Sequence, residues 1–217
     1  TYTAGICIIY NGSNGSTYAD ELIINNCVNN GEIEGDTVAG IIGNSSGNLK
    51  LSDCENNGAI NGRYSAGGIA QCIENKNSNE AEVSNCINNG NVFGGEEAAG
   101  IIDYAEGITV TNCINNGNIS SNGYVGGIFS YTSSVKGTGL VNNGKISGLE
   151  DIGGISAYDE GNSIFSKLYN TGVIDEENIG AQVSNLVKLG ESSTGEELEE
   201  EHKHDYVALS TVTKATT

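Results

Sequence analysis

The sequence predicts an all-β fold, a right-handed parallel β-helix of about six coils with a repeat of about 27 residues. Three observations support this prediction. A short motif recurs at nearly constant spacing, apolar residues alternate with period two inside each repeat, and the 217-residue chain has no Pro. Because Pro cannot donate to a backbone ladder, its absence suits a chain whose segments all pair with neighbours.

Two glycine motifs mark the repeat. Asn-Asn-Gly, with Asn-Thr-Gly as a sixth copy, places glycines 27, 32, 27, 27 and 28 residues apart, at Gly31, Gly58, Gly90, Gly117, Gly144 and Gly172. About ten residues later a Gly-Ile pair recurs, beginning at Gly40, Gly68, Gly100, Gly127 and Gly154. A fixed period of this length is typical of solenoids, in which each repeat buries its apolar face only against its neighbours.

Each repeat is expected to contain three short strands. The first surrounds the Gly-Ile pair. The second precedes a column of Cys and Leu, where apolar residues such as Leu49 and Leu51 alternate, which is the pattern of a strand. The third surrounds a β-branched residue two positions after each Asn-Asn-Gly glycine, such as Ile60 or Val92. Gly and Asn lie at the corners between strands, where left-handed backbone conformations are needed.

Stacked coils would bring equivalent residues into columns about 4.8 Å apart. The apolar columns would form a dry core, and the corner asparagines would form amide ladders like those of cross-β stacks. A leucine-rich-repeat-like solenoid is the alternative, because Leu49, Leu51 and Cys54 fit its consensus. The Gly-rich second half of each unit, as in residues 58–62, argues against it because that half lacks a helix or a leucine run.

Composition and charge exclude several functions. Asp and Glu total 28 and Lys and Arg total 9, so the net charge is −19, which argues against nucleic acid as a partner because phosphate binding needs basic residues. No apolar stretch approaches the ~18 residues of a transmembrane helix, so we expect no membrane insertion. The chain opens at Thr1 without an initiator Met or a signal peptide, and we expect it to be a piece of a longer protein.

The chain divides into a predicted β-helix domain, residues 1–186, and an acidic tail, residues 187–217. The tail carries five Glu within residues 196–201, which is typical of a solvated linker. His202, His204 and Tyr206 follow this run.

The segments 66–69 and 83–92 resemble the GLUG-type repeats of bacterial surface proteins, with Ile in place of the Leu of the Gly-Leu-x-Gly motif. The tail resembles the opening of a small module of gut-bacterial surface proteins, which starts His-x-His-x-Tyr and continues with a Thr-Lys-Ala-Thr stretch, here residues 213–216. The resemblance implies a β-helix domain of a secreted, surface-exposed, multidomain bacterial protein of the adhesin type.

The cysteines suggest either a redox or metal ladder or a column of buried thiols. Four of them share one predicted column, at Cys27, Cys54, Cys86 and Cys113. Their side chains would point the same way rather than at each other, so we expect thiols that pack as small hydrophobes. Cys7 and Cys72 fall in other columns. Both His lie in the tail, so we expect no metal site and no cofactor.

Candidate ligand-binding residues are Tyr104, Tyr131 and Tyr158, spaced 27 residues apart. On adjacent coils they would form an aromatic strip that could bind a glycan or simply stabilise a corner. Two longer loops, residues 11–18 and 72–79, offer a second candidate face, or are neutral insertions at a tolerant corner.

The alternative function is a polysaccharide lyase or hydrolase, which would need converging carboxylates. Asp103 and Asp159 are expected near one corner, as are Glu106 and Glu160, but no acidic cluster aligns with Arg63, the single Arg. We therefore expect a non-catalytic, extracellular domain that binds a glycan or a host protein, or that acts as a spacer.

Overall fold

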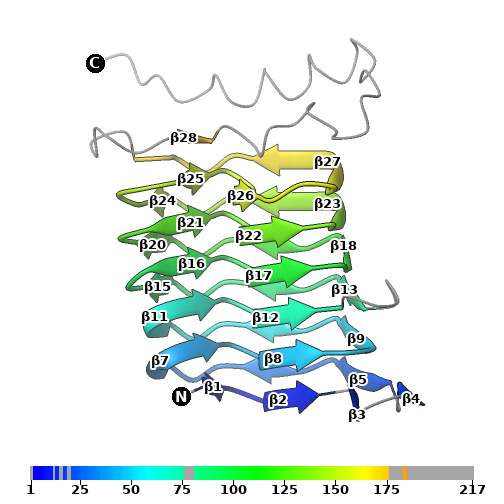
Figure 1. The fold of residues 1–217 in the computed structure, drawn as a ribbon. Helices are drawn as coiled ribbons and strands as arrows, with labels where there is room; N and C mark the ends of the chain where they lie inside the picture. The colour runs from blue at the N-terminus through cyan, green and yellow to red at the C-terminus, as the bar shows by residue number, and fades with distance from the viewer. Residues whose placement is uncertain are drawn as a thin grey trace, which may run out of the picture.

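A computed structural model confirms the parallel β-helix, and Figure 1 shows its coils stacked along one axis. The structure describes residues 2–11, 13–14, 17–18, 21–75, 81–175 and 183–184, with side chains for all of these except residues 9–18 and 183–184. Every regular element in this part of the chain is a strand, so it offers no helix that could cross a membrane. The leucine-rich-repeat alternative, which needs a different second half of each unit, is excluded.

The front sheet contains six parallel strands, separated by five full turns of the coil. They are β2 (Cys7–Asn11), β8 (Ile42–Ser46), β12 (Ala70–Glu74), β17 (Ile102–Glu106), β22 (Phe129–Ser133) and β26 (Ser156–Asp159). The sequence predicts a strand around each Gly-Ile pair, whereas the structure places the pair at a bend, and the front strand begins directly after it. In Figure 1 they run from left to right while the chain rises from its N-terminus and returns behind them, which is the predicted right-handed sense.

The back sheet contains the strands predicted before the Cys and Leu column. Its long strands are β5 (Leu22–Asn25), β9 (Leu49–Ser52), β13 (Glu82–Ser84), β18 (Thr109–Thr111), β23 (Lys136–Asn142) and β27 (Ile164–Asn170). Beyond the corner it continues as β6 (Val28–Asn29), β10 (Glu55–Asn56), β14 (Ile87–Asn88) and β19 (Ile114–Asn115).

The third sheet is bent and in several coils contains two strands, whereas the sequence predicts one short strand per coil around the β-branched residue. Its members are β1 (Tyr2–Ala4), β7 (Ile33–Ala39), β11 (Ile60–Gly67), β15 (Val92–Gly94), β16 (Glu97–Ala99), β20 (Ile119–Ser121), β21 (Tyr124–Gly126), β24 (Ile146–Ser147), β25 (Ile152–Gly153) and β28 (Val183–Ser184). The pairing of β7 with β11 shifts between Gly62 and Ser65. At the same corner a Cβ on Gly94 would lie 1.8 Å from the carbonyl oxygen of Glu97, so this coil needs glycine there, whereas the next coil carries Ser121 at the equivalent position. A small antiparallel hairpin, β3 (Ser13–Asn14) and β4 (Thr17–Tyr18), lies in the first long loop.

The bend divides the interior into two apolar cores. The larger core lies between the front and back sheets and includes Ile101, Leu51 and Phe129. The smaller core lies within the bent sheet and includes Ile60 and Val92. A column of asparagines separates them, at Asn29, Asn56, Asn88, Asn115, Asn142 and Asn170; we call it the inner ladder.

The inner ladder is hydrogen-bonded along its whole length. Each Nδ2 donates to the Oδ1 of the next coil at 2.7–2.8 Å, and also to the carbonyl oxygen two residues on. Its amides face the Gly-Ile glycines closely: a Cβ on Gly100 would lie 2.4 Å from Cγ of Asn115. This contact explains why the recurring glycine is needed in every coil.

The adjacent residues form an outer ladder that points the opposite way. In this ladder, which contains Asn30, Asn57, Asn89, Asn116, Asn143 and Thr171, each side chain donates to the preceding coil at 2.7–3.0 Å. The predicted amide ladders are thus confirmed, and they occur as an opposed pair. Their dipoles cancel rather than add along the axis.

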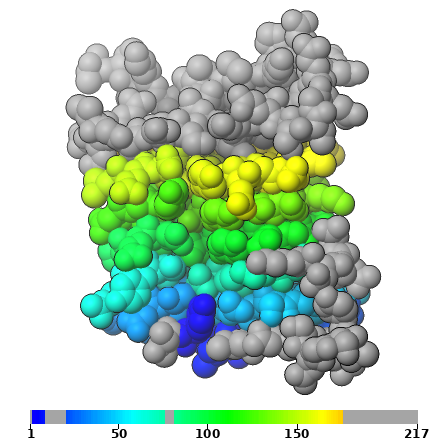
Figure 2. All heavy atoms as spheres, in the orientation of Figure 1, coloured from blue at the N-terminus to red at the C-terminus, as the bar shows by residue number. Residues whose placement is uncertain are grey.

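The predicted buried thiols are also confirmed, and left-handed corners are present, although no Asn-Asn-Gly or Gly-Ile residue is among the described left-handed residues. Left-handed residues precede the Cys and Leu column in all six coils, at Asn26, Asp53, Asn85, Asn112, Gly139 and Lys167, with φ between 52° and 67°. Cys54, Cys86 and Cys113 are at most 1% exposed, and all six cysteines are free thiols. Figure 2 shows the coils as successive layers in contact on the viewed face.

Candidate binding face

The predicted tyrosine strip lies on the outer surface of the front sheet. Tyr104, Tyr131 and Tyr158 occupy equivalent positions of β17, β22 and β26, in the column that also contains Cys72. The rings of Tyr104 and Tyr131 stack with centroids 4.6 Å apart and an angle of 5° between their planes. Tyr131 and Tyr158 follow at 5.5 Å and 29°. The predicted stacking is therefore confirmed, and ligand binding by these residues stays a prediction.

Two of the tyrosine hydroxyls donate to carboxylates at the edge of the sheet. Tyr104 Oη donates to Glu106 Oε2 at 3.1 Å, and Tyr131 Oη donates to Glu160 Oε2 at 2.6 Å. Partial burial, together with the negative charge and hydrogen bond of Glu106, raises the pKa of Tyr104 to about 12. The pKa of Tyr131 is raised further by partial burial and by its bond to Glu160. Both hydroxyls therefore stay protonated at physiological pH.

The stacking limits what the strip can bind. Sugar rings pack on aromatic faces, but Tyr131 lies between two other rings, so its faces are covered. Tyr158, which is 44% exposed, is the accessible end of the strip. The edge of Tyr124, from β21 of the bent sheet, meets it at 6.1 Å and 69°.

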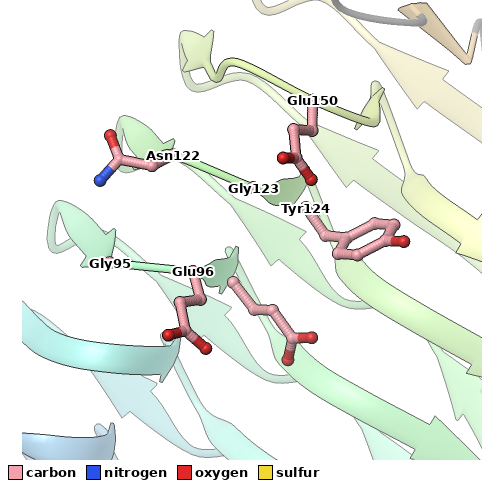
Figure 3. Close-up of a pocket in the computed structure, with 7 residues that line it drawn as sticks. Gly95, Glu96, Asn122, Gly123, Tyr124 and Glu150 are labelled. Carbon is pink, nitrogen blue, oxygen red and sulfur yellow. The ribbon is translucent and has the colours of Figure 1, made fainter.

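Tyr124 links the strip to a shallow hollow of about 310 Å³ that the sequence did not predict. The hollow is lined by Gly95, Glu96, Glu97, Asn122, Gly123, Tyr124 and Glu150 (Figure 3). Three turns of the bent sheet contribute these residues, one above another. The bend itself brings Tyr124 toward the front sheet, and its sequence signal is incomplete, because glycine precedes the turn at positions 62 and 94 but Ser121 occupies the equivalent position before Tyr124.

A buried carboxyl group lies between this hollow and the strip. Asp103 of β17 is fully buried; its Oδ2 accepts from Gln71 Nε2 at 3.2 Å, while its Oδ1 has no hydrogen-bond partner. Burial raises the pKa of Asp103 well above its usual range, and the negative charge of Glu97 raises it further. The Ser130 hydroxyl lies near enough to favour the ionised form without making a well-directed hydrogen bond.

The carboxylates named in the sequence prediction do not form one cluster. Asp103 and Asp159 lie on different columns of the front sheet, with β22 between their strands. Asp159 Oδ1 instead accepts from Thr132 and Ser163, at 2.9 and 2.6 Å. The carboxylate whose charge acts on Asp103 is Glu97. Because Asp103 is fully buried, a ligand could reach only Glu97 of these two groups. Among the described residues no group of three or more His, Cys, Asp or Glu is placed to hold a metal ion.

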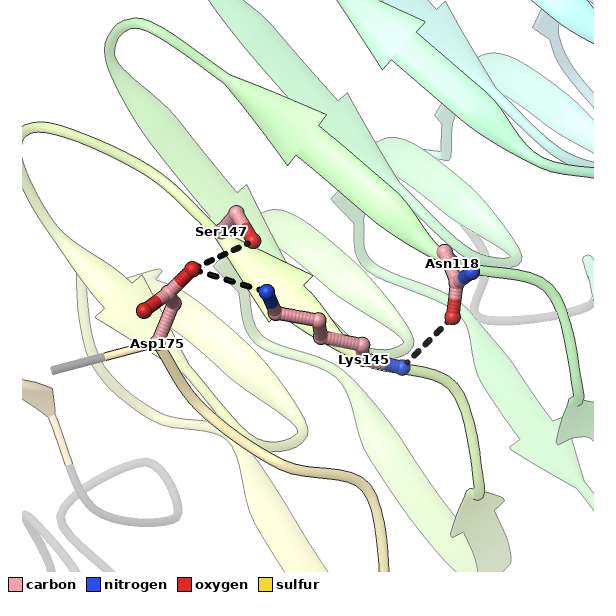
Figure 4. A network of polar contacts seen from close by, with 4 residues as sticks. All are labelled: Asn118, Lys145, Ser147 and Asp175. Atoms are coloured by element: carbon pink, nitrogen blue, oxygen red, sulfur yellow. Dashed lines mark hydrogen bonds and ion pairs between the residues drawn. The ribbon is translucent and has the colours of Figure 1, made fainter. Parts of the chain in front are cut away.

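A polar network on the bent sheet links three successive coils (Figure 4). Lys145 Nζ lies 2.8 Å from Asp175 Oδ2, which also accepts from Ser147 Oγ at 3.4 Å. The Lys145 backbone N–H donates to Asn118 Oδ1 at 3.0 Å. Because these groups satisfy one another, we assign the network to axial stability rather than to a ligand.

Comparison with models of protein families, with curated proteins and with solved structures finds no match to this chain. Residues 12, 15, 16 and 76–79 of the two predicted long loops, and the whole tail of residues 187–217, lie outside the described residues.

Proposed function

We propose that this domain is a rigid, non-catalytic spacer in a secreted, cell-surface bacterial protein of the GLUG-repeat type. It would hold whatever precedes and follows it a fixed distance apart. The acidic surface suits an exposed position, because a net charge far from zero favours solubility.

The observation that carries the proposal is the unbroken hydrogen bonding along the axis. Each coil bonds to the next through three parallel sheets and through both amide ladders, from Asn29 to Asn170 and from Asn30 to Thr171. The N-terminus and β27 lie at opposite ends of the stack in Figure 1. A pull between the two ends would thus load every coil in series.

A series of coil-number variants tests the spacer function. Deleting residues 89–115 joins Asn88 to Asn116 and removes one 27-residue coil with the register kept. Duplicating the same segment adds one. Small-angle X-ray scattering should give a maximum dimension that changes by about 4.8 Å per coil, and circular dichroism should stay that of a β-sheet protein. A dimension that does not follow coil number would contradict a rigid spacer.

Glycan binding is the second candidate, favoured by the exposed ring of Tyr158 beside Tyr124 and the hollow. A glycan array would test it, with Tyr158→Ala removing the accessible ring and Tyr131→Ala removing the centre of the strip. Loss of binding in both variants would support this candidate. Cleavage of any polysaccharide by the intact domain, abolished by Glu97→Gln, would instead support the lyase or hydrolase alternative.

A further inference from the structure

The outer ladder contains the residue pair that is chemically least durable in proteins. Seven Asn-Gly pairs fall in the described part of the chain, beginning at Asn30, Asn57, Asn61, Asn89, Asn116, Asn122 and Asn143. In such a pair the glycine backbone nitrogen can attack the Asn Cγ, because no side chain on glycine blocks it. A C–N bond forms, ammonia leaves with the former Nδ2, and a cyclic succinimide results. Water then opens the ring to Asp or to isoaspartate.

This reaction requires the Asn amide to turn toward the following backbone nitrogen. An amide held by hydrogen bonds must first break them, so each bond slows the reaction. The glycine N–H does not separate Asn122 from Asn89, the two extremes of the series: Gly123 N donates to Ser121 Oγ at 3.1 Å, much as Gly90 N donates to Asn56 O at 3.2 Å. The side-chain bonds therefore decide the order.

Asn89 is the most firmly held of the seven. Its Nδ2 donates to Glu55 Oε1 at 2.8 Å and to Asn57 Oδ1 at 2.9 Å, and its Oδ1 accepts from Asn116 at 2.8 Å. The other members inside the outer ladder, Asn57, Asn116 and Asn143, each have one bond to the coil below and one to the coil above.

Three pairs are held less firmly. Asn30, at the open end of the ladder, accepts one bond from Asn57 at 3.0 Å. Asn61 donates one bond to Glu32 Oε1 at 2.7 Å. Asn122 is exposed, and its side chain makes no hydrogen bond to any described residue. Figure 3 shows its amide pointing away from Tyr124 and Glu150, at the rim of the hollow.

We propose that, of the seven Asn-Gly pairs in the described part of the chain, Asn122 deamidates fastest in the folded domain and that the outer ladder protects the repeated Asn-Gly corners. The rate falls in the order Asn122, then Asn30 and Asn61, then Asn57, Asn116 and Asn143, then Asn89. Isoaspartate adds one carbon to the backbone, which would shift the register of a ladder strand but is accommodated in the turn of Asn122. Conversion there adds a carboxylate beside Glu96, Glu97 and Glu150.

Peptide mapping by mass spectrometry tests this order directly. The full chain is held for weeks at mildly alkaline pH in water enriched in heavy oxygen, once folded and once in urea. In the folded chain Asn122 should take up heavy oxygen at least about tenfold faster than Asn89. In urea all seven pairs should convert at similar rates. Equal rates in the folded chain, or a faster Asn89, would overturn the proposal.

Two variants isolate the role of the hydrogen bonds. Glu32→Ala removes the side-chain bond of Asn61 at an exposed position and should raise the rate at Asn61 to that of Asn122. Asn122→Ser should abolish the fastest conversion and leave the unfolding midpoint unchanged. An Asn61 rate unaffected by Glu32→Ala would show that backbone geometry, rather than the amide bonds, decides the rate.

Discussion

Some columns hold the same residue type in the first coil and in the interior coils, yet these residues are buried very differently. Ile6 is 50% exposed, whereas the equivalent Ile101 is fully buried. Cys27 and Asn29 are partly exposed, whereas Cys86 and Asn88 are fully buried. An identical repeat is therefore stabilised only as far as its neighbours cover it, as expected of a solenoid.

The opposite end of the stack differs from the first coil. Ile155 and Leu168, on the last full coil, are at most 1% exposed. In the larger core the uncovered end is therefore the N-terminal one, whereas in the smaller core Ile174 at the C-terminal end is more exposed than Ile33. Substitutions at equivalent positions of the first and interior coils can measure how much a neighbour contributes.

The largest effect is expected at the Asn-Asn-Gly glycine. A Cβ at Gly117 would lie 1.9 Å from the carbonyl oxygen of Gly90, whereas the nearest atom to a Cβ at Gly31 is 3.7 Å away. We expect Gly117→Ala to lower the free energy of unfolding by more than about 3 kcal/mol, because a whole coil must move. Gly31→Ala should have almost no effect. Equilibrium unfolding in urea measures both, and equal losses would contradict the role of the neighbouring coil.

The inner ladder should show a smaller difference of the same kind. Asn88→Ala removes the acceptor of Asn56 Nδ2 and the donor to Asn115 Oδ1, both in the buried interior. The variant leaves Asn115 Oδ1 and Gly90 O without the Asn88 donor and Asn56 Nδ2 with one bond instead of two, which should cost about 2–4 kcal/mol, and Asn29→Ala, at the open end, should cost about 1 kcal/mol. The same urea series measures both. A ladder whose end and middle are equally sensitive would show that burial does not strengthen it.

Asp103 is a buried residue whose substitution should stabilise the fold, in contrast to the glycine and asparagine substitutions above. Its pKa is raised on folding, mainly by burial, so the folded state holds its proton more tightly than the unfolded state does. Its stability contribution is therefore present at low pH and is lost as the pH rises from about 4, the unfolded value, toward the raised folded value.

Asp103→Asn keeps the shape and the bond to Gln71, and its amide nitrogen can donate toward Ser130. At neutral pH it should raise the free energy of unfolding, because it removes the cost of ionising a fully buried carboxyl group. It should also flatten the decline in stability above about pH 4. Asp159→Asn, at a carboxylate that already accepts two hydrogen bonds, should not stabilise. A destabilised Asp103→Asn would show that an ionised Asp103 is needed.

Most of the fold could be predicted from the sequence, because in a solenoid the residues that lie one repeat apart in the sequence stack in one column of the structure. The period of about 27 residues, the alternation at Leu49 and Leu51, and the glycines and asparagines at corners suffice to predict the sheets, the core and the ladders. The bend of the third strand was not predicted, because it depends on how closely the backbone approaches at Gly62 and Gly94. The opposite hydrogen-bond directions of the inner and outer ladders were also not predicted, because the sequence does not show which amide of a stacked pair donates.

The candidate site was only partly predictable for the same reason. Stacking of Tyr104 on Tyr131 follows from their spacing along one column. The meeting of Tyr124 with Tyr158, and of Glu97 with Asp103, crosses from one sheet to another over the bend. Such contacts depend on the cross-section of the coil, which the repeat period does not determine.

Native-state hydrogen exchange, read by mass spectrometry, tests the central claim most directly. Backbone amides of β9, β13 and β18 should exchange far more slowly than those of β5, which pairs on one side only among the described strands. Protection that rises from the first coil toward the interior would support neighbour-dependent stability. Equal protection of β5 and β13 would contradict it.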